Sequence, residues 1–424
     1  MIAGTGIERR WSSAWRAAAA VPLKMGIVVL FVGVAPSCGP APHEGNGAGK
    51  ALDVAIAEIE AGRRTTPLVV QPAKGADATV TFLVKSSNGR VPRIVSDVTG
   101  WGENAIDDTF DATAGTMTRV GSTDWYRLDA QVASGARIEY LTVHGRTDYR
   151  TDPHNPRQAA FRGGDPVSEF VASDYVPPQG LAEGAAAPAG TTTEATIDSR
   201  ALGGPRRVTV YTPAGYRRDG AYPVAVFHAG WGLPQGGETP RLLDRLIAHR
   251  AIEPIVGVFL ESHRSGDADF HEGRPMRAFL NREVPAWLAS RFGVTKRADE
   301  RAIFGVSFGA KDALEAALDP AGAYGRLGLL IPGRRLGRAD LDAVAASRTR
   351  RVRVAILAGR YDAANLDTAR NARRAFADAG HAVEYLEVPE GHNPSTWRNH
   401  LRDVLVTLFG RSVPGIVSSP SGAS

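Results

Sequence analysis

The chain has 424 residues, of which 43% are hydrophobic and 22% charged, and its formal net charge is +5. This length accommodates two or three domains, and the composition is typical of a globular protein and excludes a disordered one. The basic residues are scattered among nearly as many acidic ones, which argues against a nucleic-acid-binding stripe. The single cysteine, Cys38, excludes a disulfide framework and a CxxC zinc site.

Residues 1–38 have the pattern of an export leader. Basic residues precede the short apolar segment "MGIVVLFVGV" at residues 25–34. The following "APSC" places Cys38 where a bacterial lipoprotein carries its lipid, although Pro36 stands where a small or aliphatic residue is usual. We expect an exported protein, either periplasmic, on the cell surface or secreted, with Cys38 as a candidate lipidation and membrane-attachment site. The sequence contains no run of about 18 uninterrupted apolar residues, so no membrane-spanning helix is predicted.

The next part of the chain changes from a tether to short strands. Residues 39–64 are expected to be a flexible tether with one short helix. In "TVTFLVK", the residues Val80, Phe82 and Val84 alternate with polar ones, which is typical of a strand with one buried face. The segments "RIVSDVTGW", "DWYRLDAQV" and "ARIEYLTVHG" predict further strands, with turn residues between them.

These strands predict a small β-sandwich over residues 65–175, followed by a Pro/Gly/Ala-rich linker over residues 176–190. Three aromatic residues, Trp101, Trp125 and Tyr140, have two interpretations. They form either the core of the sandwich or a platform for stacking sugars, and the core is the better interpretation.

Residues 191–411 show a different pattern, in which continuous apolar strands alternate with amphipathic helices. An antiparallel hairpin is expected first, followed by buried strands such as "YPVAVFHAG", "PIVGVFLES" and "VRVAILAG". This alternation predicts an α/β fold with a doubly wound, mostly parallel sheet. Residues 412–424 have nothing to bury and are expected to be loose.

A candidate nucleophile, Ser307, lies in "GVSFG" between a predicted strand and a predicted helix. Catalytic residues gather at the carboxyl ends of the strands in such sheets. Gly305 and Gly309 allow the close approach of strand and helix that an exposed nucleophile requires. The pattern alone is weak, because a glycine-rich turn with a serine also arises by chance.

An acid and a base follow Ser307 in the chain order serine, acid, histidine, which is one of the orders in which catalytic triads occur. Asp362 comes just after one strand, and His392 just after the next. Taken singly, Asp362 is equally well a helix cap, and a Gly-His loop is more often structural than catalytic. Three such residues at successive strand ends predict a triad in which His392 deprotonates Ser307 and Asp362 orients the imidazole.

Other acids and bases in this region are poorer candidates. Asp367 lies deeper, near a helix start, His381 precedes its strand, and His400 lies within a helix. The oxyanion that forms during acyl transfer needs two N–H donors. We expect one from the amide of Phe308 and one from "HAGW", with Gly230 as the candidate, although an ordinary glycine turn is the alternative there.

Several positions near the predicted strand ends are candidates for substrate contacts. Basic residues on this face suit an anionic or catechol-like substrate, but a solvated surface is the simpler interpretation. The candidates are Trp231, Arg264, Arg334 and Arg335.

Residues from about 65 to 410 resemble the enterochelin (enterobactin) esterase-like family. The resemblance is carried by "MTRVGSTDWYRLDAQVASGARIEYLTVHG" and "DPHNP" in the first half, and by "GVSFGA", "ESHRSGDADF" and "AGHAVEYLEVPEGHNPSTW" in the second. It implies an N-terminal immunoglobulin-like early-set domain joined to an α/β-hydrolase related to esterase D, feruloyl esterases and antigen 85 mycolyltransferases. It also implies Ser307 as nucleophile, His392 as base and Asp362 as acid.

Two positions depart from the family pattern. "FHAGW" stands where many relatives read Asp-Gly, which is expected to change oxyanion geometry or substrate preference. Ala310 stands where a third glycine is usual, which is a minor change in packing.

The leading functional hypothesis is an exported serine esterase that hydrolyses a small-molecule or glycan-linked carboxylic ester. One alternative passes the acyl group to a sugar hydroxyl, as antigen 85 enzymes do. Another is a catalytically weak surface protein that binds a carbohydrate or an iron chelate. No H-E-x-x-H, P-loop or dinucleotide motif occurs, so no metal or cofactor is expected. No nucleic-acid partner is expected either, and the sequence leaves the oligomeric state open.

Overall fold

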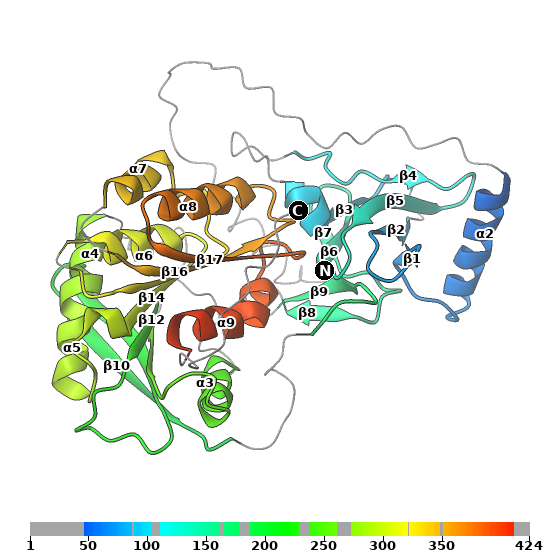
Figure 1. Ribbon diagram of the computed structural model, residues 1–424. Helices are drawn as coiled ribbons and strands as arrows, with labels where there is room; N and C mark the ends of the chain where they lie inside the picture. Colours follow the sequence, from blue (N-terminus) through cyan, green and yellow to red (C-terminus); the bar gives the residue numbers. More distant parts are fainter. Residues whose placement is uncertain are drawn as a thin grey trace, which may run out of the picture.

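The computed structural model describes residues 46–86, 89–102, 111–160, 165–177, 187–228, 238–260, 273–320, 322–347 and 351–410. The expected leader with Cys38 and the expected tail of residues 412–424 lie outside these ranges. Figure 1 shows two parts side by side, a β part within residues 46–177 and an α/β part within residues 187–410. Within the described ranges, no helix has both the length and the hydropathy needed to span a membrane.

Two antiparallel sheets pack face to face in the β part. The first contains β1 (Leu68–Val70), β2 (Ala78–Lys85), β4 (Thr118–Arg119) and β5 (Trp125–Val132). The second contains β3 (Arg93–Ser96), β6 (Arg137–His144), β7 (Asp148–Arg150), β8 (Gln158–Ala160) and β9 (Pro166–Val171). Their strand orders are β1–β2–β5–β4 and β3–β6–β9–β8, and β7 pairs with β6.

The core between these sheets is aromatic and aliphatic, as the alternating pattern predicts. Phe82 and Tyr140 meet edge to face with ring centroids 4.8 Å apart. Tyr140 lies in this core, which confirms the core interpretation for it. That interpretation is wrong for Trp125, which is buried on the outer face of the first sheet against Ile56 and Ile59 of the N-terminal helix. Trp101 is half-buried and lies outside the strands, in the 3₁₀ turn η1 (Asp97–Gly102).

Two local expectations for this part are corrected. The predicted tether contains a longer helix, α2 (Asn46–Glu60), whose Ile56 and Ile59 pack on the outer face of the first sheet. The strand expected over "RIVSDVTGW" ends at Ser96, where η1 begins. The hydroxyl of Thr99 accepts the Ser96 N–H at 2.9 Å, and such local side-chain bonds compete with a sheet ladder.

One eight-stranded sheet forms the centre of the α/β part. Its strands are β10 (Thr191–Ser199), β11 (Gly204–Thr212), β12 (Val224–His228), β13 (Val256–Leu260), β14 (Arg301–Val306), β15 (Arg326–Leu330), β16 (Arg353–Gly359) and β17 (Ala382–Val388). The order is β10–β11–β13–β12–β14–β15–β16–β17. β10 pairs with β11 and β11 with β13 in antiparallel fashion, and every later neighbour is parallel. The predicted α/β fold class is therefore confirmed, including the initial hairpin.

Helices cover both faces of this sheet (Figure 1). The described helices are α3 (Glu238–Ala248), α4 (Arg274–Ala278), α5 (Val284–Arg291), α6 (Gly309–Leu318), α7 (Arg338–Ala346), α8 (Leu366–Asp378) and α9 (Pro394–Phe409). A π-helical turn, η4 (Phe279–Glu283), joins α4 to α5, and a 3₁₀ turn, η5 (Ala298–Glu300), precedes β14. Residues 274–291 are thus one composite helix with a π-helical middle.

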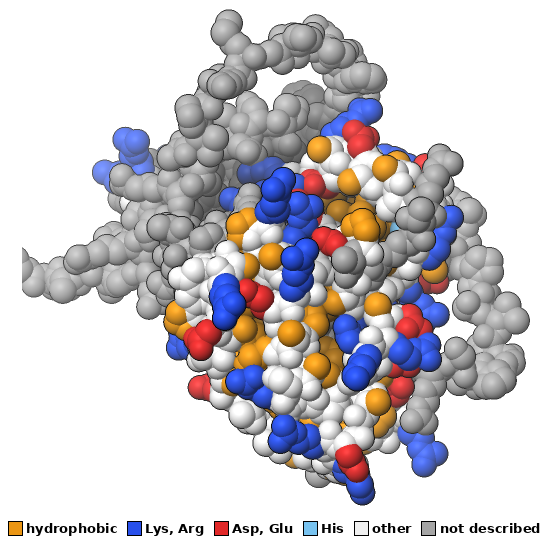
Figure 2. All heavy atoms as spheres, turned by 90° about the vertical axis from the view of Figure 1, so that its left-hand side faces the viewer, with side chains coloured by type: hydrophobic (Ala, Val, Ile, Leu, Met, Phe, Trp, Pro, Cys, Tyr) orange, Lys and Arg blue, Asp and Glu red, His pale blue; other side chains and the backbone are white. Residues whose placement is uncertain are grey.

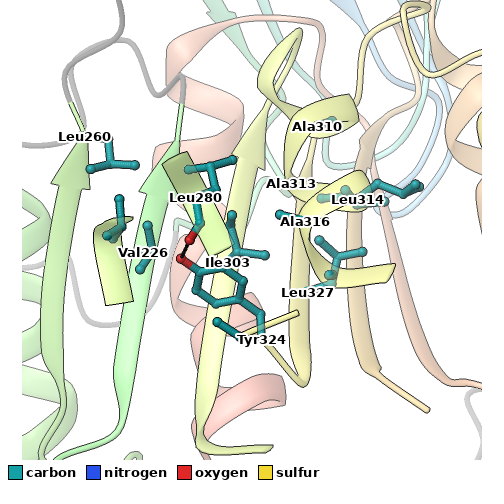
Figure 3. Packing of buried hydrophobic residues seen from close by; sticks show 14 of the residues in the cluster. Val226, Leu260, Leu280, Ile303, Ala310, Ala313, Leu314, Ala316, Tyr324 and Leu327 are labelled. Atoms are coloured by element: carbon teal, nitrogen blue, oxygen red, sulfur yellow. Dashed lines mark hydrogen bonds between the residues drawn. The ribbon is translucent and has the colours of Figure 1, made fainter. Parts of the chain in front are cut away.

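Each face of the sheet has its own apolar core. Leu242 of α3 and Leu401 of α9 belong to one core, whereas Leu314 of α6 and Phe376 of α8 belong to the other. Figure 3 shows part of the second core, where the buried Tyr324 hydroxyl donates to the carbonyl of Leu280 at 2.7 Å. This bond satisfies a polar group within the apolar layer.

Figure 2 shows the charged side chains on one face of the α/β part. On the face of the α/β part remote from the β part, basic side chains are interspersed with acidic and neutral ones (Figure 2).

Candidate active site

Ser307 lies on a sharp turn between β14 and α6. Its φ of 52° is in the left-handed region, which costs a non-glycine residue roughly 1–3 kcal/mol. The turn is held to β15, because the Ser307 N–H donates to the carbonyl of Leu330 at 3.0 Å. A Cβ on Gly305 would lie 2.4 Å from the carbonyl oxygen of Gly309, so the strand and helix approach more closely than a side chain permits.

The structure brings the three predicted triad residues together. Ser307 Oγ lies 2.8 Å from Nε2 of His392, and Nδ1 of the same ring lies 2.6 Å from Oδ2 of Asp362. The short contact to a carboxylate assigns the ring proton to Nδ1 and leaves Nε2 free to accept the Ser307 proton. Asp362 is buried, and the His392 side chain is 16% exposed, so the pair is largely shielded from water.

Asn365 completes this arrangement and was missed in the sequence. Its Nδ2 donates to Oδ1 of Asp362 at 2.7 Å, which occupies the carboxylate oxygen that His392 does not use. Its Oδ1 accepts the backbone N–H of Arg334 at 2.8 Å. The spacing Asp-x-x-Asn after a strand was the available indication, because a short polar side chain three residues on reaches back to the acid.

The loops that carry Asp362 and His392 are bonded to each other. The Arg360 N–H donates to the carbonyl of Val388 at 2.7 Å, and the Tyr361 N–H to that of Glu390 at 3.0 Å. A Cβ on Gly359 would lie 2.6 Å from the Glu390 carbonyl oxygen. The acid and the base therefore come from backbone segments in direct contact.

The alternative acids and bases have other partners. Asp367 is exposed on α8. His381 contacts the Ser347 hydroxyl at 3.1 Å, and burial lowers the pKa of its imidazole, with Arg351 adding to the effect. His400 on α9 contacts Glu390 at 2.8 Å.

Of the two expected oxyanion donors, only the one at Phe308 lies within the described residues. Phe308 follows Ser307 and caps α6, where backbone N–H groups have no partner within the helix. Gly230, Trp231 and Arg264 lie outside the described residues. β12 ends at His228, two residues before Gly230, and His228 contacts Asp312 of α6 at 3.0 Å.

The two remaining substrate candidates lie near the nucleophile. The guanidinium of Arg335 stacks over the Phe308 ring, 4.6 Å from its centroid. Phe308 itself is 39% exposed, which is unusual for so large an apolar side chain. Arg334 is bound through its backbone to Asn365 and is half-buried. An exposed aromatic ring and a cation thus stand beside Ser307.

Comparison with known proteins gives one family and a clear structural likeness. The family model described as "Putative esterase" matches residues 199–408. The ferric enterobactin esterase of Salmonella typhimurium has a TM-score of 0.63 and 18% identity, covering 81% of this chain and 96% of its own. The enterobactin esterase of Shigella flexneri, solved in the presence of enterobactin, has a TM-score of 0.59 and 19% identity, with the same coverage. No curated protein sequence matches the chain. Because 81% of the chain is covered, the likeness of fold includes the β part.

Proposed function

We propose that this chain, a carboxylic ester hydrolase whose residues 199–408 belong to the esterase family, acts through an acyl-enzyme formed on Ser307. The observation that carries the proposal is the pair of hydrogen bonds joining Ser307, His392 and Asp362 at 2.8 and 2.6 Å. This geometry suits general-base activation of a hydroxyl nucleophile.

In the first half of the reaction, Nε2 of His392 takes the proton of Ser307 as Oγ bonds to the ester carbonyl carbon. Asp362 keeps the ring oriented and stabilises the imidazolium. His392 then returns this proton to the alcohol oxygen as the carbon–oxygen bond to the alcohol breaks. The acyl group stays on Ser307.

In the second half, His392 takes a proton from water as the water oxygen bonds to the acyl carbon. The proton passes to Oγ when the acyl–serine bond breaks, which releases the acid and restores the enzyme. We assign one oxyanion donor to the Phe308 amide and the other to the loop containing Gly230.

We propose that the acyl group packs on Phe308 and Arg335. An exposed ring that carries a guanidinium on one face suits an acyl group with an aromatic ring or an anionic substituent. Two of the similar structures are enterobactin esterases, which supports an ester substrate.

We also propose that the enzyme is exported, because residues 1–38 have the charge and hydropathy of a leader. Lipid attachment at Cys38 stays a prediction from the sequence.

Labelling by a fluorophosphonate tests the proposed nucleophile. The wild-type protein should be labelled on Ser307 and should hydrolyse aryl esters, and Ser307→Ala should lose the label. Turnover should fall by about 10⁴-fold or more in that variant, since the triad acts as a unit. Equal labelling or equal turnover in the two proteins would rule out Ser307 as the nucleophile.

A further inference from the structure

The loop that carries Asp362 rests on the β part. The Ala133 N–H donates to the hydroxyl of Tyr361 at 2.6 Å, and the Tyr361 ring packs against the apolar core between the two β sheets. On the other side of the acid, Ala363 faces η1, since a Cβ on Gly100 would lie 3.8 Å from the Ala363 Cβ. Of the two neighbours of Asp362, Tyr361 therefore bonds to the β part and Ala363 lies close to η1.

The loop that carries His392 rests on the same surface. The Arg137 N–H donates to the carbonyl of Pro389 at 3.1 Å, which continues the β6 strand edge onto this loop. In Figure 1 the carboxyl ends of β16 and β17 point toward the β part.

Asp97 of η1 also contacts this loop. It is 1% exposed, and its carboxylate accepts the Glu139 N–H at 2.7 Å and the Trp101 indole N–H at 2.9 Å. It also accepts from Nδ2 of Asn393, at 3.2 and 3.3 Å to its two oxygens. Three donors thus converge on one buried carboxylate, and one of them comes from the residue after His392.

The residue before His392, Gly391, lies directly against the same carboxylate. A Cβ on Gly391 would lie 1.9 Å from Oδ1 of Asp97, so only glycine fits there. Asn393 in turn caps α9, because its Oδ1 accepts the Thr396 N–H at 3.0 Å. His392 is therefore held between a glycine in contact with Asp97 and an asparagine that joins Asp97 to the start of α9.

A network of buried charges surrounds Asp97. Glu139 accepts from Arg137 at 3.0 Å. Arg137 also binds Glu169, and its guanidinium lies 3.8 Å from Glu390, two residues before His392. Burying this many carboxylates around one guanidinium is costly, and an apolar junction would be the cheaper way to join two domains.

We propose that Asp97 is a positioning residue for the esterase reaction: it fixes the backbone of residues 391–393 so that the His392 imidazole stands between Ser307 and Asp362. The inference rests on the proposed function of Ser307 and His392. It makes the β part a component of the catalytic centre, because η1 and β6 supply polar contacts to this loop alongside those that come from α9.

The full-length enzyme with Asp97→Asn tests this role. An amide accepts at one oxygen only and turns an N–H₂ toward donors, so the loop loses its fixed position. A displacement of this kind lowers kcat by about 10–100-fold. KM for an aryl ester should change little, and fluorophosphonate labelling of Ser307 should slow in parallel with kcat.

Two variants separate positioning from general damage. Asp152→Asn is the matched control, since Asp152 is also buried in the β part but accepts from Thr66, Tyr140 and the His154 N–H, all of them in that part. It should keep the wild-type kcat per folded molecule. The exchange Asp97→Asn with Asn393→Asp reverses donor and acceptor while keeping an oxygen to cap α9, and it should restore much of the lost kcat.

A wild-type kcat in folded Asp97→Asn, or an equal loss in Asp152→Asn, would overturn the positioning role. If Asp97→Asn does not fold, Asn393→Ser takes its place, because the shorter serine still caps α9 but lacks the amide N–H₂ that donates to Asp97. Unchanged kcat there has the same meaning. Failure of the proposed function looks different, because Ser307 of the wild-type enzyme would then not be labelled at all.

Discussion

Two carboxylates hold His392, one from each part of the molecule, and they act at different points. Asp362 comes from the same sheet and accepts from the imidazole itself at 2.6 Å. Asp97 comes from the β part, 296 positions before Asn393, and reaches the backbone segment that carries the ring. The candidate catalytic acid, Asp362, lies at the end of a neighbouring strand of the same sheet. The proposed positioning residue, Asp97, comes from the other part of the molecule, which packs against the backbone of this loop.

The surroundings of the two carboxylates differ as well. Asp362 has a neutral neighbour, Asn365, on its second oxygen. Asp97 is buried beside Glu139, and burial together with this like charge raises the pKa of Asp97 to about 7. The first carboxylate lies in the candidate active site, and the second lies in a junction between the two parts where burial of charge is costly.

Asp362→Asn, which acts on the first of these carboxylates, should cause the largest loss of kcat. The amide presents an N–H to the imidazole or favours the wrong tautomer, and kcat should fall by about 10⁴-fold with the fold intact. The measurement is kcat for an aryl ester, together with the rate of fluorophosphonate labelling. Asp367→Asn, at the exposed neighbouring acid of α8, is the matched control and should retain full activity. A larger loss in Asp367→Asn would reassign the acid.

Gly391→Ala should have the next largest effect, and it acts on the Asp97 side. The added methyl would meet Oδ1 of Asp97 at 1.9 Å, so the loop or η1 must shift. Overpacking of this kind costs about 1–3 kcal/mol of unfolding free energy, and kcat should fall as His392 moves. Chemical denaturation and steady-state kinetics measure the two effects.

The control for that substitution is Gly49→Ala on α2, where an added Cβ meets nothing within 4 Å. Alanine there should be neutral or slightly stabilising, because it favours a helix. Equal behaviour of the two variants would show that the contact between Gly391 and Asp97 is unimportant.

Periodicity and chain order were enough to predict the α/β sheet and the candidate triad. Parallel strands buried on both faces read as continuous apolar runs, and polar residues just past them collect at one edge. This logic selects Ser307, Asp362 and His392 over Asp367, His381 and His400 without knowledge of any distance.

The same logic could not reveal Asp97. It lies in "RIVSDVTGW", whose pattern predicts one strand. The neighbouring residues do not indicate that the strand ends at Ser96, or that Gly100 and Trp101 take φ values of 59° and 57°. Its role depends on how two domains meet, and that contact leaves no period in the sequence. Gly391 gives an indirect indication only, because a glycine before a histidine is compatible with many turns.

The smallest expected effect concerns the stability of the Asp97 junction as a function of pH. In the unfolded chain this carboxyl ionises with a pKa near 4, and in the folded protein with a pKa of about 7. Between these values the folded state holds a proton that the unfolded state has lost, so the free energy of unfolding falls as pH rises, by at most about 1.4 kcal/mol per pH unit. The groups that face this carboxylate are Glu139, whose pKa is also raised by burial, and Arg137, which lowers both acids' pKa values.

Asp97→Asn removes the ionising group and should flatten this dependence between about pH 4 and 7. Trp101→Phe should do the opposite and extend the fall above pH 7, because the indole hydrogen bond lowers the pKa of Asp97. Urea denaturation of each variant from pH 5 to 8 measures the slopes. Identical slopes in wild type and Asp97→Asn would contradict this prediction. They would mean that Asp97 is already ionised below pH 5, so that no protonation change of this carboxyl contributes to the stability of the junction.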